Sequence, residues 1–211
     1  MLPAVIPIFP LPNVVLFPNV LLPLHIFEPR YRVMLADALN GDRIIGMTLL
    51  QPGWQATPDT ERPRVYPVGC AGVITHVEPL SDGRSDIVLR GVAKFRIASE
   101  PASSKPYRVA AVETVHDITA ADDKLALRDM RRRLEMLVLA ALAAHKHERQ
   151  FPPGIADEDL VNALSQYLDL TPFERQALLE CGSPLIRSEM LLELLEMKVL
   201  VERNGRVEQV H

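Results

Sequence analysis

The stretch that decides the fold is IPIFPLPNVVLFPNVLLPLHIFEPRYRVML, residues 6–35. It places six prolines in an apolar run that carries almost no charge in its first two thirds: Pro7, Pro10, Pro12, Pro18, Pro23 and Pro29. Because proline fixes φ and lacks an N–H, no long helix can run through this part, and any strand must be short or lie at an edge or bulge. We therefore predict extended segments at 6–11 and 20–25, followed by a short helix with Pro29 in its first turn.

The predicted short helix carries an apolar stripe at helical spacing. Its members are Tyr31, Met34, Leu35, Ala38 and Leu39. We expect Asn40-Gly41 to end this helix with a left-handed cap. A strand at 43–50 and a long loop at 51–64, with three prolines and the only tryptophan, should follow.

The middle of the chain predicts a β-hairpin. Two β-branched runs, 73–77 and 87–89, flank Ser81-Asp82-Gly83-Arg84, and an Asp-Gly pair favours a tight turn. Gly91 allows a bulge or sharp bend after it. Residues 107–115 supply one more strand.

After residue 117 the apolar period changes from two to about 3.6, which predicts helices. The first should cover 121–144, and the second should begin at Asp157. Thr171-Pro172-Phe173-Glu174 has the form of a capping box, and Ser183-Pro184 opens a last helix in a similar way.

These patterns together predict an α+β fold in two subdomains. Residues 1–117 should form a β-rich subdomain with one short helix. Residues 118–211 should form a helical bundle.

Composition excludes several classes of function. The chain has 211 residues and 48% hydrophobic content, which is typical of an ordinary globular protein. Its net charge of −4 gives no electrostatic field that would attract nucleic acid or an anionic membrane. Cys70 and Cys181 form neither a disulfide framework nor a metal spacing, which suits a reducing compartment. We find no signal-peptide pattern and no run of about 18 apolar residues, so we expect a cytoplasmic protein that does not enter a membrane.

Three blocks, in the same order, resemble the N-terminal domain of the Lon ATP-dependent protease family. They are PIFPLPNVVLFPNVLLPLHIFEPRYRVML at 7–35, GCAGVITHVEPLSDGRSDIVLRGVAKFRI at 69–97 and LSQYLDLTPFERQALLECGSPLIRSEMLLELL at 164–195. The resemblance implies a PUA-like pseudobarrel of strands followed by a helical bundle, used to recognise protein substrates or partners. A similar module occurs in cereblon, where it helps to bind an adaptor of an E3 ligase.

The chain departs from the full protease in a way that matters for its function. No G-x-x-x-x-G-K-[ST] loop is present to cradle a triphosphate. We expect no room for the Ser-Lys proteolytic module after the bundle ends near Val201. We therefore interpret the chain as a stand-alone recognition domain that is not an enzyme and needs no cofactor.

Several polar clusters invite a chemical role but have simpler explanations. His145-Lys146-His147-Glu148 could suggest a metal site, yet residues two apart on a helix do not face each other. Arg131-Arg132-Arg133 could suggest RNA, but Asp129 and Glu135 are available to pair with these arginines. We therefore predict no metal site and regard nucleic acid as an unlikely partner.

Catalytic motifs are missing as well. The sequence has no G-x-S-x-G elbow, H-E-x-x-H pair or G-x-G-x-x-G turn, so we name no catalytic residue. We interpret Cys70 as a core residue. Asp157-Glu158-Asp159 is better explained as favourable charge in the first turn of a helix than as a cation site.

Two aromatic residues of the polar loop are the candidate binding residues. Trp54 and Tyr66 could anchor a peptide or partner, although Trp54 could equally fold back onto the barrel as a lid. We expect Phe9, Phe17 and Phe27 to lie in the core.

Our leading hypothesis is a non-enzymatic module that binds peptide or unfolded polypeptide in an apolar groove formed by the barrel loops, with the junction to the bundle and an unpaired strand edge as further candidate contributors. The alternatives are an adaptor that docks one specific folded partner and, further off, a PUA-like RNA-binding module or an enzyme of unrecognised type.

Overall fold

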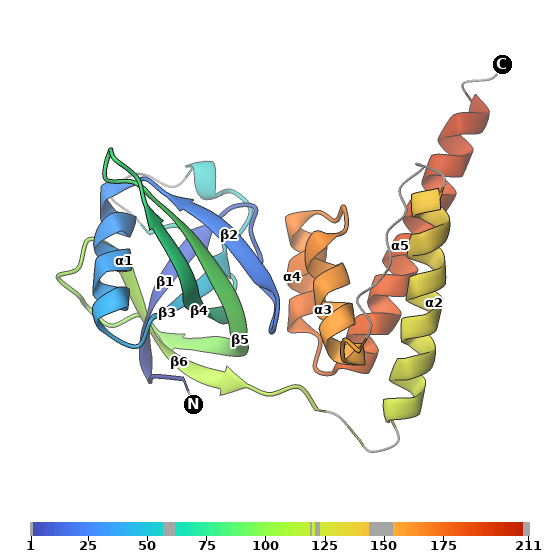
Figure 1. Cartoon of the computed structure of the whole chain (residues 1–211), viewed down its shortest axis with the longest axis horizontal. Coiled ribbons are helices and arrows are strands. Elements are labelled where there is room, and N and C mark those ends of the chain that lie inside the picture. The colour runs from blue at the N-terminus through green and yellow to red at the C-terminus, as the bar shows by residue number, and fades with distance from the viewer. Residues whose placement is uncertain (1, 57–61, 119, 121–122, 144–153, 209–211) are drawn as a thin grey trace. The chain divides into compact units, whose positions relative to one another are not determined.

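The computed structural model describes residues 2–56, 62–118, 120, 123–143 and 154–208 (Figure 1). Six strands and five α-helices make it a mixed α/β protein in this part of the chain. In chain order they are β1 (Val5–Leu11), β2 (Leu21–Ile26), α1 (Pro29–Asn40), β3 (Ile44–Leu49), the 3₁₀ helix η1 (Trp54–Ala56), β4 (Val68–Pro79), β5 (Ser85–Ser99), β6 (Arg108–Val115), α2 (Asp123–Ala143), α3 (Asp157–Tyr167), α4 (Pro172–Glu180) and α5 (Pro184–Glu208). None of the described helices has the length and apolar character to cross a membrane.

The chain forms two compact units. Unit 1 combines Met1–His116 with Ser165–Glu180, and unit 2 combines Asp117–Leu164 with Cys181–His211. Three expectations from the sequence stay predictions. They are the division near residue 117 into a strand-rich and a helical subdomain, the helical bundle, and the PUA-like designation.

The strands of unit 1 form one sheet whose order is β2-β5-β4-β3-β1-β6, and β5 also pairs with β6. That extra pairing closes β5, β4, β3, β1 and β6 into a ring, visible as the coiled sheet of Figure 1. Strand β2 pairs with β5 alone, so it is an edge strand, and it carries Pro23 where an edge tolerates proline. The extended segments and the hairpin predicted from the sequence are confirmed.

A close backbone approach explains the bend in β5. Gly72 pairs with Gly91 while Ala71 pairs with Ala93, so one extra residue bulges from β5. The Gly91 N–H donates to the Val20 carbonyl at 2.9 Å, and a Cβ on Gly91 would lie 2.0 Å from the Phe17 oxygen. The predicted bulge is confirmed, and only glycine lets the 17–20 segment pack there.

Two further glycines make room for the central ring of the barrel. Phe95 is fully buried in a cluster with Ile6, Ile8, Ala71 and Ala110. A Cβ on Gly46 would lie 2.9 Å from the Phe95 ring, and a Cβ on Gly69 would lie 2.7 Å from it. The core is therefore fitted around this ring.

Helix α1 begins as predicted but ends differently. Pro29 is in its first turn, and Tyr31, Met34, Leu35 and Ala38 are buried. Our expectation of a left-handed cap at Asn40-Gly41 was wrong, because Gly41 has a φ of −119°. The left-handed residue is Arg43, at a φ of 59°, and its N–H bonds back to the Ala38 carbonyl at 2.9 Å.

Of the three phenylalanines expected in the core, two are there. Phe9 is 4% exposed and Phe17 is fully buried, but Phe27 is 58% exposed, so the prediction for Phe27 was wrong. Side chains alternate along a strand, and the buried Ile26 ends β2, which leaves the next residue directed outwards. The Phe27 ring stacks on the exposed His25, with their ring centroids 6.0 Å apart.

Residues 165–180 belong to unit 1 because buried glutamine side chains bond to the barrel backbone. Gln166 accepts from the Phe17 N–H at 3.0 Å, and Gln176 donates to the Val68 carbonyl at 2.9 Å. The capping box that opens α4 is confirmed: the Glu174 N–H donates to the Thr171 hydroxyl, and the Glu174 carboxylate accepts from the Thr171 N–H. Strands and helix are thus joined by specific polar contacts.

Unit 2 is built around a buried arginine. The Arg187 side chain, on α5, is fully buried and donates to the Asp117 carboxylate at 2.7 Å and to the Asn162 amide oxygen at 2.8 Å. Ser183 caps α5 as predicted, accepting from the Ile186 N–H at 3.2 Å.

The three consecutive arginines of α2 pair within unit 2. Arg131 bonds to Glu135 and Asp157, Arg132 lies 3.4 Å from Asp129, and Arg133 lies 3.6 Å from Glu196. The predicted pairing with Asp129 and Glu135 is confirmed.

Candidate functional site

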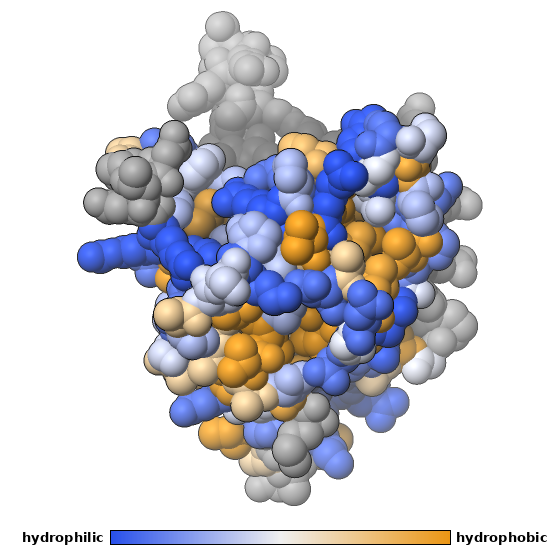
Figure 2. Space-filling view, turned by 90° about the vertical axis from the view of Figure 1, so that its left-hand side faces the viewer, coloured by the Kyte–Doolittle hydropathy of each residue, from blue (hydrophilic) through white to orange (hydrophobic). Residues whose placement is uncertain are grey.

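An apolar groove of about 590 Å³ lies between helix α1 and the β4–β5 hairpin. Its lining residues are Pro29, Arg32, Val33, Leu35, Ala36 and Leu39 from α1 and Val77, Pro79, Gly83 and Ser85 from the hairpin. Figure 2 looks onto the side of the molecule that carries α1 and shows apolar side chains gathered there among hydrophilic ones. This hollow is the strongest candidate for a binding site in unit 1.

Helix α1 has two apolar faces, and this explains the groove. One face is buried against the barrel, where the Tyr31 ring lies 4.2 Å from the Phe9 ring, centroid to centroid. The other face presents Val33, Ala36 and Leu39, and Val33 is 42% exposed. An isolated surface helix needs only one apolar face, so the second face is available to a ligand.

Asp37 fixes α1 from its polar side. Its carboxylate accepts from the Tyr107 hydroxyl at 2.6 Å and from the Lys105 ammonium at 2.7 Å. The hydrogen bonds from Lys105 and Tyr107 lower the pKa of Asp37, and desolvation together with the Asp37 bond raises the pKa of Tyr107. The helix wall of the groove is thereby tied to the chain segment that leads into β6.

The opposite wall is held by the hairpin turn. The Leu80 N–H bonds to the Arg84 carbonyl at 2.8 Å, and Gly83 adopts a φ of 80°. The Arg84 guanidinium bonds to Asp82 at 2.5 Å, and this contact lowers the pKa of Asp82 to about 2. The Asp-Gly pair predicted to make this turn therefore also shapes the groove.

Arg32 is the one charged residue among those that line the groove. A Cβ on Gly83 would lie 2.3 Å from the Arg32 Nη2, so the guanidinium rests against the bare turn glycine. Val77 and Pro79 line the groove and side chains alternate along β4, so Glu78 between them faces away. The apolar groove thus has a positive charge at one end.

The two residues predicted to bind, Trp54 and Tyr66, do not line this groove. Both are partly buried: Trp54 begins η1, and the Tyr66 N–H bonds to the Leu49 carbonyl at 2.9 Å. Their role in binding stays a prediction.

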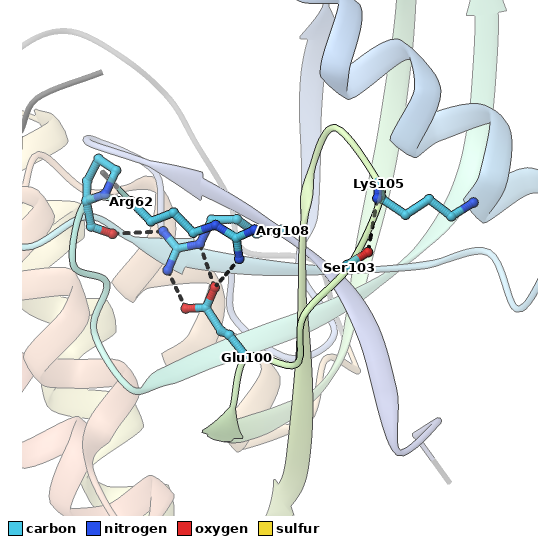
Figure 3. A network of polar contacts seen from close by, with 6 residues as sticks. Arg62, Glu100, Ser103, Lys105 and Arg108 are labelled. Carbon is cyan, nitrogen blue, oxygen red and sulfur yellow. Dashed lines mark hydrogen bonds and ion pairs between the residues drawn. The ribbon is translucent and has the colours of Figure 1, made fainter. Parts of the chain in front are cut away.

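The chain just before Tyr66 is held by an ion-pair network (Figure 3). The Arg108 guanidinium bonds to both oxygens of Glu100 and donates to the Pro63 carbonyl at 2.8 Å. Arg62 lies 3.7 Å from the same carboxylate. A second hollow, of about 570 Å³, lies beside these residues and is bordered by Gln51 and Arg64 as well.

The other candidates carry no metal-binding group in the part of the chain that the structure describes. His145–Glu148 lies outside the described residues, and Cys70 is fully buried, as predicted for a core residue. Asp157, Glu158 and Asp159 occupy the first turn of α3, where negative charge is favourable. Within the described ranges no three His, Cys, Asp or Glu side chains are grouped so as to hold a metal ion.

Sequence reasoning missed the groove, since its walls lie more than 35 positions apart and share no motif. One signal was present: Val33 and Ala36 lie beside the predicted buried stripe, and together with Leu39 of that stripe they recur every three residues. A second apolar stripe on a short helix indicates that both faces have partners.

Comparison with known proteins gives one consistent result. The model of the family described as "ATP-dependent protease La (LON) substrate-binding domain" matches residues 5–197. Lon protease of Anaeromyxobacter dehalogenans is 27% identical over 205 residues, and Lon protease 2 of Myxococcus xanthus is 28% identical over 205 residues. These matches cover 93% of this chain but only 24% of each relative, so the chain spans about a quarter of their length.

Solved structures share the fold. A Lon N-terminal domain protein from Xanthomonas campestris superposes with a TM-score of 0.62 and 23% identity, covering 90% of this chain and 97% of that one. The N-terminal domain of a Mycobacterium avium complex Lon protease gives a TM-score of 0.71 at 16% identity, covering 91% and 98%. With the family match over nearly the whole length, the resemblance seen in the sequence is confirmed, and this chain belongs to the LON substrate-binding domain family.

Proposed function

We propose that this chain binds extended segments of unfolded polypeptide in the groove between α1 and the β4–β5 hairpin, and that it does so without any catalytic step of its own. The observation that carries the proposal is the second apolar face of α1, which lines a groove of about 590 Å³. Membership of a substrate-binding family supports the same conclusion.

The dimensions of the groove suit a short extended peptide. Its helix wall runs from Pro29 to Leu39, which spans about 15 Å at the helical rise per residue. An extended chain covers that length with about five residues. Apolar side chains of such a segment would contact Val33, Ala36 and Leu39, and burial of each would contribute about 1.5–3 kcal/mol before ordering costs.

A single substitution in the groove tests the proposal. Val33→Asp introduces a charge at an exposed helix position, so the fold should persist while the dissociation constant for a fluorescent apolar peptide rises about tenfold or more. Fluorescence anisotropy measures the binding, and thermal unfolding checks the fold. Unchanged affinity in a folded Val33→Asp protein would refute the assignment of the groove.

A second candidate function is docking of one specific folded partner. It is favoured by exposed apolar side chains on the helices of unit 2, where Leu125 is 75% exposed on α2 and Leu200 is 56% exposed on α5. Leu125→Asp serves as the matched control, since it also places a charge at an exposed apolar helix position. Loss of binding with Leu125→Asp and not with Val33→Asp would favour the docking function.

We propose Trp54 and Tyr66 as an additional contact for the bound peptide. If the chain uses them, Trp54→Ala weakens peptide binding in a protein whose groove is intact. If affinity stays the same, the loop plays no part in recognition.

A further inference from the structure

We infer that the preferred occupant of the groove is an apolar peptide segment that carries one acidic side chain, whose carboxylate pairs with Arg32. This inference rests on the proposed function and adds to it the chemical class of the ligand. It follows from the charges around one end of α1.

Arg32 is the one arginine at this end that has no anionic partner. Arg30 pairs with Glu28 at 2.8 Å, and Arg84 pairs with Asp82 at 2.5 Å. The Arg32 guanidinium makes no hydrogen bond or ion pair with any described residue, although it lines the groove. A ligand carboxylate could therefore accept a charge-assisted hydrogen bond from the Arg32 guanidinium.

The beginning of α1 reinforces the preference for an anion. The first turn of α1 contains no acidic residue, and Glu28, which precedes the helix, makes no side-chain cap while its carboxylate is bound by Arg30. The N–H groups of the first turn therefore receive no hydrogen bond from the Glu28 side chain, and the Glu28 charge is balanced by Arg30. Arg32, the fourth residue of α1, and the helix dipole both favour a negative group at the same end of the groove.

The bare glycine of the hairpin turn sets where the guanidinium lies. Gly83 is required by its φ of 80°, and the Arg32 side chain occupies the space that any Cβ at that position would need. The guanidinium thus lies at the edge of an apolar surface and remains exposed to solvent, so a charge pair formed there should be modest and should weaken with salt.

The carboxylate should come from an internal aspartate or glutamate. Arg32 lies one turn inside the end of α1, and lining residues continue on the far side of it to Pro29. A chain can therefore extend past Arg32 in both directions, whereas a C-terminal carboxylate would leave one end of the groove empty.

The test uses three fluorescent ten-residue peptides that differ at one central position, which is Glu, Gln or Lys within an otherwise identical apolar segment. At low salt the wild-type protein should bind the Glu peptide about two- to fivefold more tightly than the Gln peptide and bind the Lys peptide most weakly. A fourth peptide, with Gln at the centre and a free C-terminus in place of an amide, tests a terminal carboxylate and should gain less.

Three variants locate the effect. Arg32→Ala should reduce binding of the Glu peptide to the level of the Gln peptide, and Arg32→Glu should reverse the order so that the Lys peptide binds best. Arg30→Ala, a matched control whose arginine is already paired, should keep the wild-type order. Equal binding of all three peptides by the wild type, or an unchanged order in Arg32→Ala, would overturn the inference.

The outcomes separate this inference from the proposed function. If every peptide binds equally and Val33→Asp abolishes all binding, the groove is a polypeptide site without charge preference. If no peptide binds in a saturable way, the proposed function itself fails.

Discussion

The two units of this molecule keep different kinds of side chain at their centres. Among the described residues of unit 1, the largest fully buried side chains are the phenyl rings of Phe17 and Phe95, and in unit 2 the largest is the Arg187 guanidinium. The barrel core is therefore shaped by glycines that leave room for an aromatic ring, while the helical unit buries a guanidinium among apolar side chains such as Leu134 and Leu191. The difference implies that core truncation and charge removal should act on separate parts of the chain.

The largest effect is expected from truncating the central ring. Phe95→Ala leaves a cavity in a core that Gly46 and Gly69 have shaped around that ring, so the free energy of unfolding should fall by about 4 kcal/mol. Chemical denaturation measures the loss. Phe27→Ala is the control, because its exposed side chain should contribute less than about 0.5 kcal/mol. Similar losses for the two variants would contradict the barrel packing described above.

Removing the buried cation of unit 2 should cause the second largest loss in the free energy of unfolding. Arg187→Ala leaves the Asp117 carboxylate without this partner and should lower the free energy of unfolding by about 3 kcal/mol. Amide hydrogen exchange should show that α2 and α5 lose protection, while the Arg187→Ala protein keeps the peptide affinity of the wild type. Arg133→Ala, which removes an exposed ion pair on α2, should change stability by less than about 0.5 kcal/mol. Loss of amide protection in β4 and β5 of the Arg187→Ala protein, in place of α2 and α5, would contradict the difference between the two units.

A smaller effect is expected where α4 is bonded to the barrel. Gln176→Ala removes the donor to the Val68 carbonyl, and the unpaired buried carbonyl should lower the free energy of unfolding by about 1–2 kcal/mol. Urea denaturation measures it, with the exposed Gln55→Ala as the control. If Gln176→Ala is as stable as the control, polar contacts do not anchor this helix.

The smallest effect is a pH dependence of the hairpin turn. The folded pKa of Asp82 is about 2, below its ordinary value of 3.8, so its contribution is fully present above about 3.8 and is lost as the pH falls through 2. Titration of the Asp82 carboxyl by NMR checks the value. Arg84→Ala should return the pKa towards 3.8, since the Arg84 contact is its main cause. A titration midpoint near 3.8 in the wild type would show that the pair does not form in solution.

Most local motifs were readable from the sequence, with the cap at Asn40-Gly41 as an exception, and long-range partnerships were not readable. The Asp82-Gly83 turn and the Thr171–Glu174 capping box each depend on residues within four positions, and both are confirmed. Arg187 lies in an amphipathic segment whose pattern does not reveal that Asn162 and Asp117 meet it. Burial of a charge requires knowledge of what packs around it.

The candidate site shows the same limit. The aromatic residues Trp54 and Tyr66 stood out in a polar loop, but the groove forms where α1 passes beside a hairpin that is distant in sequence. Its apolar residues looked like ordinary core residues because composition does not distinguish a face that packs inwards from one that is left exposed. The helical spacing placed Met34 in the buried stripe and left Val33 out of it, but only the three-dimensional arrangement shows that Val33 lines a groove.

The most direct test of the account is to map an apolar, glutamate-containing peptide on the ¹⁵N-labelled protein by NMR titration. The account predicts saturable shift changes concentrated in Arg30–Leu39 of α1 and Val77–Ser85 of the hairpin, and their loss in Val33→Asp. Changes confined to the loop around Trp54 and Tyr66, or to α2 and α5, would contradict the assignment of the groove as the polypeptide-binding site.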